Sequence, residues 1–354
     1  MTSIQAEPLA RTSVIARNRL FGLALALAAL VALVYGVRFN VPPIVSFQMF
    51  AAPLTPIDDI EARHLANSPL WVWIGHGLRL DGFAKWALVS ATLTGLAIAG
   101  LIAHVYASFA NDRERGLALL LLATSPVFFH MLGWSAKGEA LLILGFLGLV
   151  WARPVWAASL CAAIMVLALP IEGLGLIAMT MLWRRPDGAR ALAIAAGAVI
   201  GILAHSAYLF ALGDFSNFGF VAKGFLAPGD QRSPLWFAAS LWLEFGWFWL
   251  VIAAAVAMGL VRRHELALLA LGAALSLFST VPERPAILIA LPLVFAIIER
   301  IVARRPTLPP ALIAIAAILS LIQAEAAWTG TATTLTMSHW PATIEQVKQW
   351  APTR

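Results

Sequence analysis

The sequence predicts an all-α protein: a polytopic, integral membrane helical bundle with about eleven transmembrane helices. Hydrophobic residues make up 61% of the chain and charged residues only 12%, whereas soluble domains carry roughly 25% charged residues. Apolar runs long enough to cross a bilayer recur along the whole chain. Arginines fall in short clusters between these runs, which is typical of membrane topology rather than of a nucleic-acid-binding face. We therefore expect one membrane domain and no nucleic-acid partner.

The apolar runs define the predicted spans in order. They cover residues 20–37, 84–108, 116–132, 140–152, 155–170, 173–183, 191–212, 235–260, 265–279, 285–299 and 309–323. The runs between 140 and 183 are short for a bilayer of about 30 Å. We expect them to be tilted, enclosed by neighbouring helices or partly re-entrant.

The two ends of the chain receive different predictions. No small-residue cleavage pattern follows the first apolar run before Arg38, so this run is expected to be retained as a span. Residues 1–323 are predicted to form the transmembrane domain, and 324–354 a short C-terminal tail on the outer side. Cys161 lies inside an apolar run and is interpreted as a packing residue.

The distribution of basic residues predicts the orientation. With the N-terminus in the cytoplasm, the inner segments hold 14 of the 24 Lys and Arg residues although they are shorter in total. Inner loops rich in positive charge are the rule for bacterial inner-membrane proteins. We therefore expect a plasma-membrane (bacterial inner-membrane) protein with its C-terminus outside. The 14 residues are all arginine: Arg11, Arg17, Arg19, Arg113, Arg115, Arg153, Arg184, Arg185, Arg190, Arg262, Arg263, Arg300, Arg304 and Arg305.

Two long outer loops are predicted, at residues 38–82 and 213–234. Prolines at the start of the first loop disfavour a continuous helix there, and a short helix is expected to begin near Ile57. Residues 65–78 are too apolar for a free loop and contain Trp71 and Trp73. They are expected to form a helix in the membrane interface, where Trp is favoured.

Chemically reactive side chains concentrate in the first outer loop. Asp58, Asp59, Glu61, Arg63 and His64 lie within seven residues of one another. On a helix, Asp59 and Arg63 share a face because they are four residues apart. The two adjacent aspartates point about 100° apart. One can therefore face a cavity while the other caps the helix or meets solvent.

Three segments together resemble the GT-C glycosyltransferases, which are polytopic membrane enzymes that use polyprenyl-phosphate-linked sugars. The pair Asp58/Asp59 followed by Ser68-Pro69-Leu70-Trp71 is similar to that family's acidic residue and following Pro-Leu-aromatic step. Ser125-Pro126 with the segment 137–142, and Glu283-Arg284-Pro285, resemble further family segments at span junctions. The second segment carries Glu139 where the family usually has Asp.

The resemblance implies transfer of a sugar, as in mannosyl- or arabinosyltransferases, from a polyprenyl-phosphate donor at the outer face. The acceptor would be a glycan, a lipid or a protein. Such a reaction needs a carboxylate base, for which Asp58 or Asp59 is the candidate, and cations to stabilise the departing phosphate. The candidate substrate- and phosphate-binding residues are Glu61, Arg63, His64, Lys137, Glu139, Lys223, Arg232 and Arg284. Asp58 and Asp59, with Glu61, are also candidate ligands for a divalent metal such as Mg or Mn.

Several alternatives stay open at this point. The acidic pair after Pro56 is also what an ordinary helix start requires. Glu244 lies within the eighth predicted span, where it either lines a cavity or anchors the span near a belt of Trp residues. Glu172 is equally compatible with burial and with exposure to solvent. The alternative functions are a transporter or flippase for a lipid-linked substrate and a non-catalytic GT-C-like relative.

Overall fold

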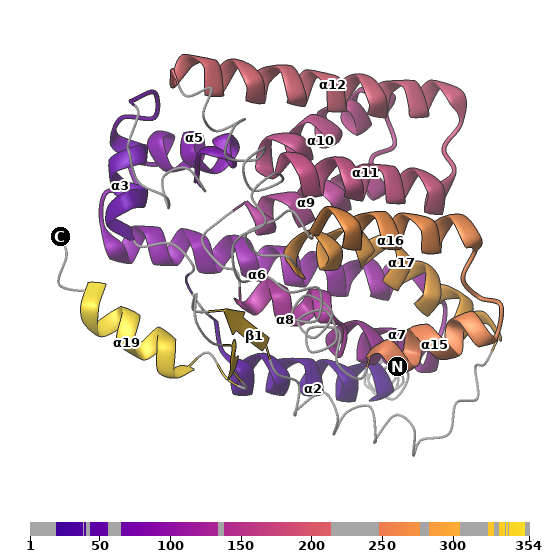
Figure 1. Cartoon of the computed structure of the whole chain (residues 1–354). Coiled ribbons are helices and arrows are strands. Elements are labelled where there is room, and N and C mark those ends of the chain that lie inside the picture. The colour runs from indigo at the N-terminus through magenta and orange to yellow at the C-terminus, as the bar shows by residue number, and fades with distance from the viewer. Residues whose placement is uncertain are drawn as a thin grey trace, which may run out of the picture.

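Most of the chain folds into long helices that lie side by side and run alternately in opposite directions (Figure 1). The computed structural model describes residues 19–37, 39, 43–55, 65–133, 138–213, 248–276, 283–304, 325–328, 333–336, 338 and 340–350. In Figure 1, α2 (Arg19–Tyr35) forms the lower edge of this layer and α12 (Gly188–Ala211) forms the upper edge. The predicted helical bundle is therefore confirmed for the described part of the chain.

Most of the remaining helices overlap predicted spans. The remaining helices are α3 (Pro43–Ala51), α5 (Pro69–Gly77), α6 (Phe83–Ser108), α7 (Asp112–Ala123), α8 (Pro126–Gly133), α9 (Glu139–Trp151), α10 (Val155–Ala168), α11 (Pro170–Arg184), α15 (Phe248–Ala257), α16 (Arg263–Ser276), α17 (Glu283–Arg304) and α19 (Trp340–Trp350). Of these, α3, α5 and α19 lie outside the predicted spans. Two short strands, β1 (Glu325–Trp328) and β2 (Thr333–Thr336), form an antiparallel pair. These strands were not predicted, and they add a small sheet to the all-α bundle.

Two of the helices, α6 and α12, are each long and apolar enough to cross a membrane, and α7 with α8 make a third candidate if they count as one span. The other helices of the described chain are shorter or carry more charge. The count of eleven spans therefore stays a prediction. The predicted span 309–323 lies outside the described residues, as does the first part of the span 235–260.

The predicted span 116–132 is broken into α7 and α8, whose axes differ by 54°. The break follows from Ser125-Pro126, because proline has no backbone N–H to continue the helical ladder. The hydroxyl of Thr124 donates to Leu120 O at 2.9 Å, and that of Ser125 donates to Leu122 O at 2.6 Å. The same two carbonyls also accept from the backbone amides of Thr124 and Ser125, so the hydroxyls add a second bond to each at the end of α7.

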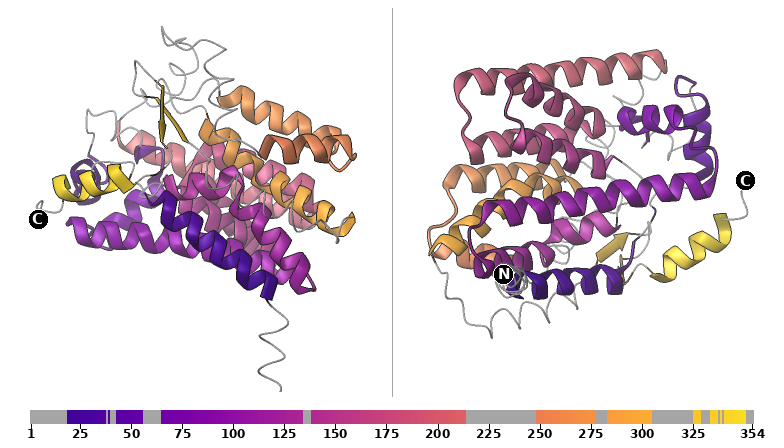
Figure 2. Two further views of the ribbon diagram at one scale, coloured as in Figure 1. Left: turned by 90° about the horizontal axis from the view of Figure 1, so that it is seen from below. Right: turned by 180° about the vertical axis from the view of Figure 1, so that it is seen from behind.

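The helices place two chemically different groups of segments at opposite ends of the bundle. At one end, the carboxylate of Asp112 accepts from the amides of Leu20 and Phe21, joining the start of α7 to the start of α2. At the same end, the Arg115 guanidinium donates to Phe109 O just after α6. We call it the Arg end. The opposite end, which carries α3, α5 and α19, is the loop end (Figure 2, right).

The C-terminal helix α19 is attached to the loop end by side-chain bonds to the backbone that follows α2. The hydroxyl of Ser338 donates to Val34 O at 2.9 Å, and the Gln346 amide donates to Phe39 O at 2.8 Å. The chain thus begins its first described helix at the Arg end and finishes its last at the loop end. This placement agrees with an odd number of crossings.

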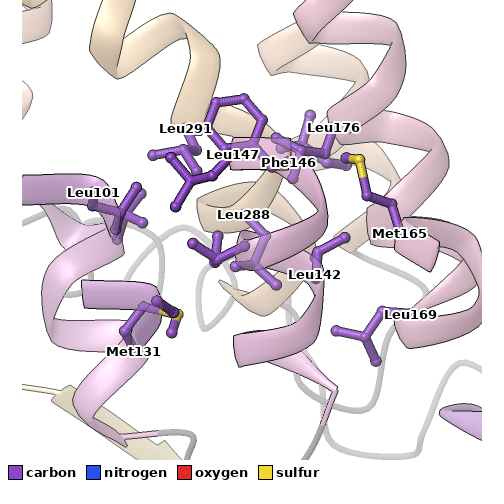
Figure 3. Packing of buried hydrophobic residues seen from close by; sticks show 14 of the residues in the cluster. Leu101, Met131, Leu142, Phe146, Leu147, Met165, Leu169, Leu176, Leu288 and Leu291 are labelled. Atoms are coloured by element: carbon purple, nitrogen blue, oxygen red, sulfur yellow. The ribbon is translucent and has the colours of Figure 1, made fainter. Parts of the chain in front are cut away.

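Helix α9 lies inside the bundle and is buried along most of its length. Its Leu142 and Phe146 gather with Met165 of α10, Leu176 of α11 and Leu291 of α17 in one apolar core (Figure 3). A helix that is apolar on all sides is stable only when neighbours surround it. This explains the short predicted spans between 140 and 183, because α9 is enclosed by protein.

Small residues allow the upper helices to approach each other closely. A Cβ added at Gly197 of α12 would lie 2.0 Å from the backbone oxygen of Ser159 in α10. A Cβ added at Gly148 of α9 would lie 2.8 Å from Cys161 Sγ. Close backbone approach through small residues is the usual means of packing helices in membranes. Cys161 fills space against α9, in line with its interpretation as a packing residue.

Candidate functional site

The structure describes two of the predicted site residues, Glu139 and Arg284. Glu139 is fully buried in the first turn of α9. Arg284 is the second residue of α17, at the end of that helix opposite the Arg end. The other predicted site residues lie outside the described residues: Asp58, Asp59, Glu61, Arg63, His64, Lys137, Lys223, Arg232 and Glu244.

Three helix starts converge at the loop end around Gly138. A Cβ added at Gly138 would lie 2.2 Å from Ala168 O and 2.5 Å from Ser68 Oγ. Gly138 immediately precedes α9, Ser68 immediately precedes α5, and Ala168 is two residues before α11. The segments 68–71 and 138–142, far apart in the sequence, are therefore packed against each other. Only glycine allows this approach, because any side chain would enter the space of both neighbours.

Two buried carboxylates lie at this junction. Glu139 occupies the first turn of α9 and is 0% exposed, and Glu172 occupies the first turn of α11 and is 8% exposed. The question of whether Glu172 meets solvent is thus answered in favour of burial. Amide groups and dipoles at helix starts favour negative charge. Burial of a carboxylate is costly without such support.

Helix α5 is held at the junction by α3. Trp71 of α5 is fully buried, and its ring makes an edge contact with Phe50 of α3 at a centroid distance of 5.8 Å. A Cβ added at Gly75 would lie 2.4 Å from the same Phe50 ring. The Nδ1 atom of His76 lies 2.7 Å from Phe50 O. A helix is therefore present where one was predicted, packed against a helix that the proline-rich sequence did not predict, and its place in the membrane interface stays a prediction.

Polar atoms at the junction have unused hydrogen-bonding capacity. Ser68 Oγ and Trp71 Nε1 are buried, and neither has a hydrogen-bond partner among the described residues. Outside the junction, at the start of α6, the Lys85 ammonium donates a 2.8 Å hydrogen bond to Asp81 and holds the pKa of that carboxyl below its usual range. Asp81 is exposed. The junction therefore differs from the surface nearby in having buried groups that can bind a ligand.

Ser68 and Trp71 place a buried hydroxyl and a buried indole N–H at the junction. In the sequence, residues 56–64 and 134–137 directly precede Leu65 and Gly138. Within the described ranges, no three His, Cys, Asp or Glu side chains cluster closely enough to hold a metal ion. The predicted metal ligands Asp58 and Asp59 lie outside those ranges.

A second group of interacting polar side chains lies at the Arg end and was not predicted as a site. His104 of α6 is buried, and its Nδ1 accepts a hydrogen bond from the Trp151 indole at 3.0 Å. Arg184 stacks on Trp183, with its Cζ 3.6 Å from the ring centroid, and pairs with Glu299 at 3.5 Å. The sequence shows these arginines only as a charge count, which indicates orientation and gives no sign that they converge.

Comparisons with protein-family models, curated proteins and solved structures find no match to this chain.

Proposed function

We propose that this chain is a membrane glycosyltransferase that moves a sugar from a polyprenyl-phosphate donor to an acceptor at the loop end of the bundle. The observation that carries the proposal is the contact between Ser68 and Gly138. These two residues belong to two of the segments that resemble GT-C enzymes, and the buried Glu139 directly follows Gly138. A resemblance in composition alone does not predict a contact between two distant segments.

The proposed reaction is a single displacement at the anomeric carbon. The acceptor hydroxyl oxygen forms a bond to that carbon, and the bond from the carbon to the phosphate oxygen breaks. The electron pair leaves with the lipid phosphate, and the hydroxyl proton passes to the carboxylate of Asp58 or Asp59. Cations stabilise the negative charge that grows on the phosphate. Lys137 and Arg284 are the best candidates, because they adjoin the described helix starts in sequence.

Glu139 has a positioning role in this proposal. Its place at the start of α9, next to the Gly138 contact, lets it orient the segments that precede α5 and α9. Ser68 Oγ and Trp71 Nε1 are available to hydrogen-bond sugar hydroxyls or phosphate oxygens. A divalent ion on Asp58 and Asp59 would add positive charge for the phosphate, and none of the steps above depends on it.

The test is a transfer assay with purified protein in vesicles and a panel of short-chain polyprenyl-phosphate hexoses and pentoses. Asp58→Asn and Asp59→Asn are made separately. Loss of the general base is expected to lower turnover about 10²–10⁴-fold in one of the two variants. Asp81→Asn is the matched control, because Asp81 is an exposed aspartate near the loop end that pairs with Lys85. It should turn over as the unmodified protein does.

Three outcomes would contradict the proposal. Wild-type turnover in both aspartate variants would remove the assigned base. Movement of the intact lipid-linked donor across the vesicle membrane, without formation of a new glycosidic bond, would favour the transporter or flippase. Absence of turnover with every donor in the panel would favour the non-catalytic relative, provided that a thermal unfolding transition shows that the protein is folded.

A further inference from the structure

A cavity of about 420 Å³ opens at the Arg end, far from the junction at the loop end. Its walls come from the last turn of α9 with the loop that follows, the end of α11, and the first two turns of α12. A volume of this size lies within the range of small-ligand pockets, about 300–1,000 Å³.

The lining of the cavity is strongly cationic. Arg153, Arg184 and Arg190 come from three separate segments, and the lining includes no carboxylate. The nearest acids are engaged elsewhere: Asp187 accepts from the backbone amide of Arg190 at 2.8 Å, and Glu299 accepts from the Trp183 indole at 3.0 Å. Glu299 also pairs with Arg184, at 3.5 Å, and offsets part of one charge. The cavity therefore carries an excess of positive charge.

Two of the three arginines, Arg184 and Arg190, are held in place before any ligand arrives. Arg190 donates from Nη2 to Leu149 O at 3.0 Å, which joins α12 to the end of α9. Arg184 is fixed by its stacking on Trp183 and its ion pair with Glu299. Arg153 is exposed at the rim. Two preorganised guanidinium groups and one exposed one suit an oxyanion with several acceptor oxygens, because the two held groups lose little side-chain entropy on binding.

The other wall of the cavity is apolar and continues onto the exposed surface of the helices. Leu149, Met181 and Ile194 line it. Large apolar side chains beside it are exposed, with Trp156 at 69% and Leu192 at 72%. On a membrane helix such side chains contact acyl chains, whereas the binding of a free anion requires no apolar surface.

We propose that this cavity binds the phosphate headgroup of an anionic phospholipid, with the acyl chains lying against the exposed apolar surface of α10 and α12. The arginines contact the phosphate, and the apolar wall contacts the glycerol and the first acyl carbons. Basic pockets between membrane helices are known to suit anionic headgroups. Arginines that only set orientation have no need to converge on one cavity. The Arg end is also the end that we expect to face the anionic cytoplasmic leaflet.

The test measures lipid binding to the full chain in detergent by native mass spectrometry, which counts bound lipids directly. Phosphatidylglycerol should bind about tenfold more tightly than phosphatidylcholine, whose headgroup has no net charge. Arg153→Gln should weaken phosphatidylglycerol binding about tenfold. Arg113→Gln is the matched control, because Arg113 is an exposed arginine at the Arg end, on α7, outside the lining. Its effect should be less than about twofold.

Further experiments distinguish a change in binding from a change in folding, and a lipid ligand from a free anion. Arg190→Lys keeps the charge but loses the planar fork, so intermediate binding with an unchanged unfolding temperature supports a bidentate contact. Glycerol 3-phosphate and inorganic phosphate are added as competitors. Displacement of the lipid by either one, at a concentration similar to that of the lipid, would show an anion site without lipid specificity. Equal binding of the two lipids, or equal loss in the Arg153 and Arg113 variants, would also overturn the proposal.

Discussion

Replacing Gly138 with alanine tests the junction on which the proposed site depends. The new Cβ would lie 2.2 Å from Ala168 O, more than 1 Å closer than ordinary contact, and 2.5 Å from Ser68 Oγ. The serine side chain can rotate away, but the backbone oxygen moves only if α9 separates from the α10–α11 turn. Overpacking of this kind costs about 1–3 kcal/mol. We expect the upper part of that range, because two helix junctions must shift together.

The assay is thermal unfolding in detergent, with Gly95→Ala as the matched control. Gly95 lies in the middle of α6, and a Cβ added there meets nothing within 4 Å. This control should be neutral or gain about 0.5–1 kcal/mol, because alanine loses less entropy than glycine in a helix. With roughly 2–4 °C per kcal/mol, Gly138→Ala should unfold roughly 5–10 °C below the control. Equal unfolding temperatures would refute the described contact.

Two further substitutions test other parts of the bundle. Glu265, which is 2% exposed in its side chain, forms a bidentate pair with Arg300 at 2.6 and 2.7 Å. Glu265→Ala should lower the free energy of unfolding by about 3–5 kcal/mol, and replacing both residues with leucine should cost less in the same unfolding assay. Gly36 has φ +81° and contacts the Trp340 ring. Gly36→Ala should therefore lower the protection of α19 against hydrogen exchange. Gly77→Ala is the control and should leave this protection unchanged, because a Cβ at Gly77 meets nothing within 4 Å.

The helices were predictable because their limits depend on local signals. The predicted span 191–212 corresponds to α12, which begins after the capping Asp187 and ends before Gly213 at φ +67°. Asp187 starts the helix by accepting from the Arg190 amide with its side chain, and Gly213 ends it because glycine readily adopts positive φ. Helix α3 was missed because its prolines were interpreted as breakers, yet Pro43 occupies the first position of the helix, where its missing N–H costs nothing.

The sites were predictable only in part, because they depend on packing between distant segments. The segments that contain Ser68 and Gly138 were recognised separately, and the contact between these two residues requires the glycine at 138 and the fold of α10 and α11 around it. The cavity at the Arg end depends on the packing of α12 beside the ends of α9 and α11. No local pattern reports such a contact. Arginines at 153, 184 and 190 therefore looked like separate topology signals.

The helix dipole favours carboxylates at one end of the bundle and cations at the other, and it is the strongest competing explanation for Glu139. Helices α9, α11 and α17 all run from the loop end to the Arg end, and each begins with a glutamate in its first turn. Carboxylates at helix starts and cations at helix ends both complement the helix dipole, by about 0.3–1 kcal/mol each. If Glu139 served only this purpose, Glu139→Gln would lower stability slightly and leave transfer unchanged. If Glu139 positions the site, the same variant should keep its unfolding temperature within a few degrees and lose turnover. Turnover of Glu139→Gln therefore distinguishes a carboxylate that only stabilises the start of α9 from one that positions the site.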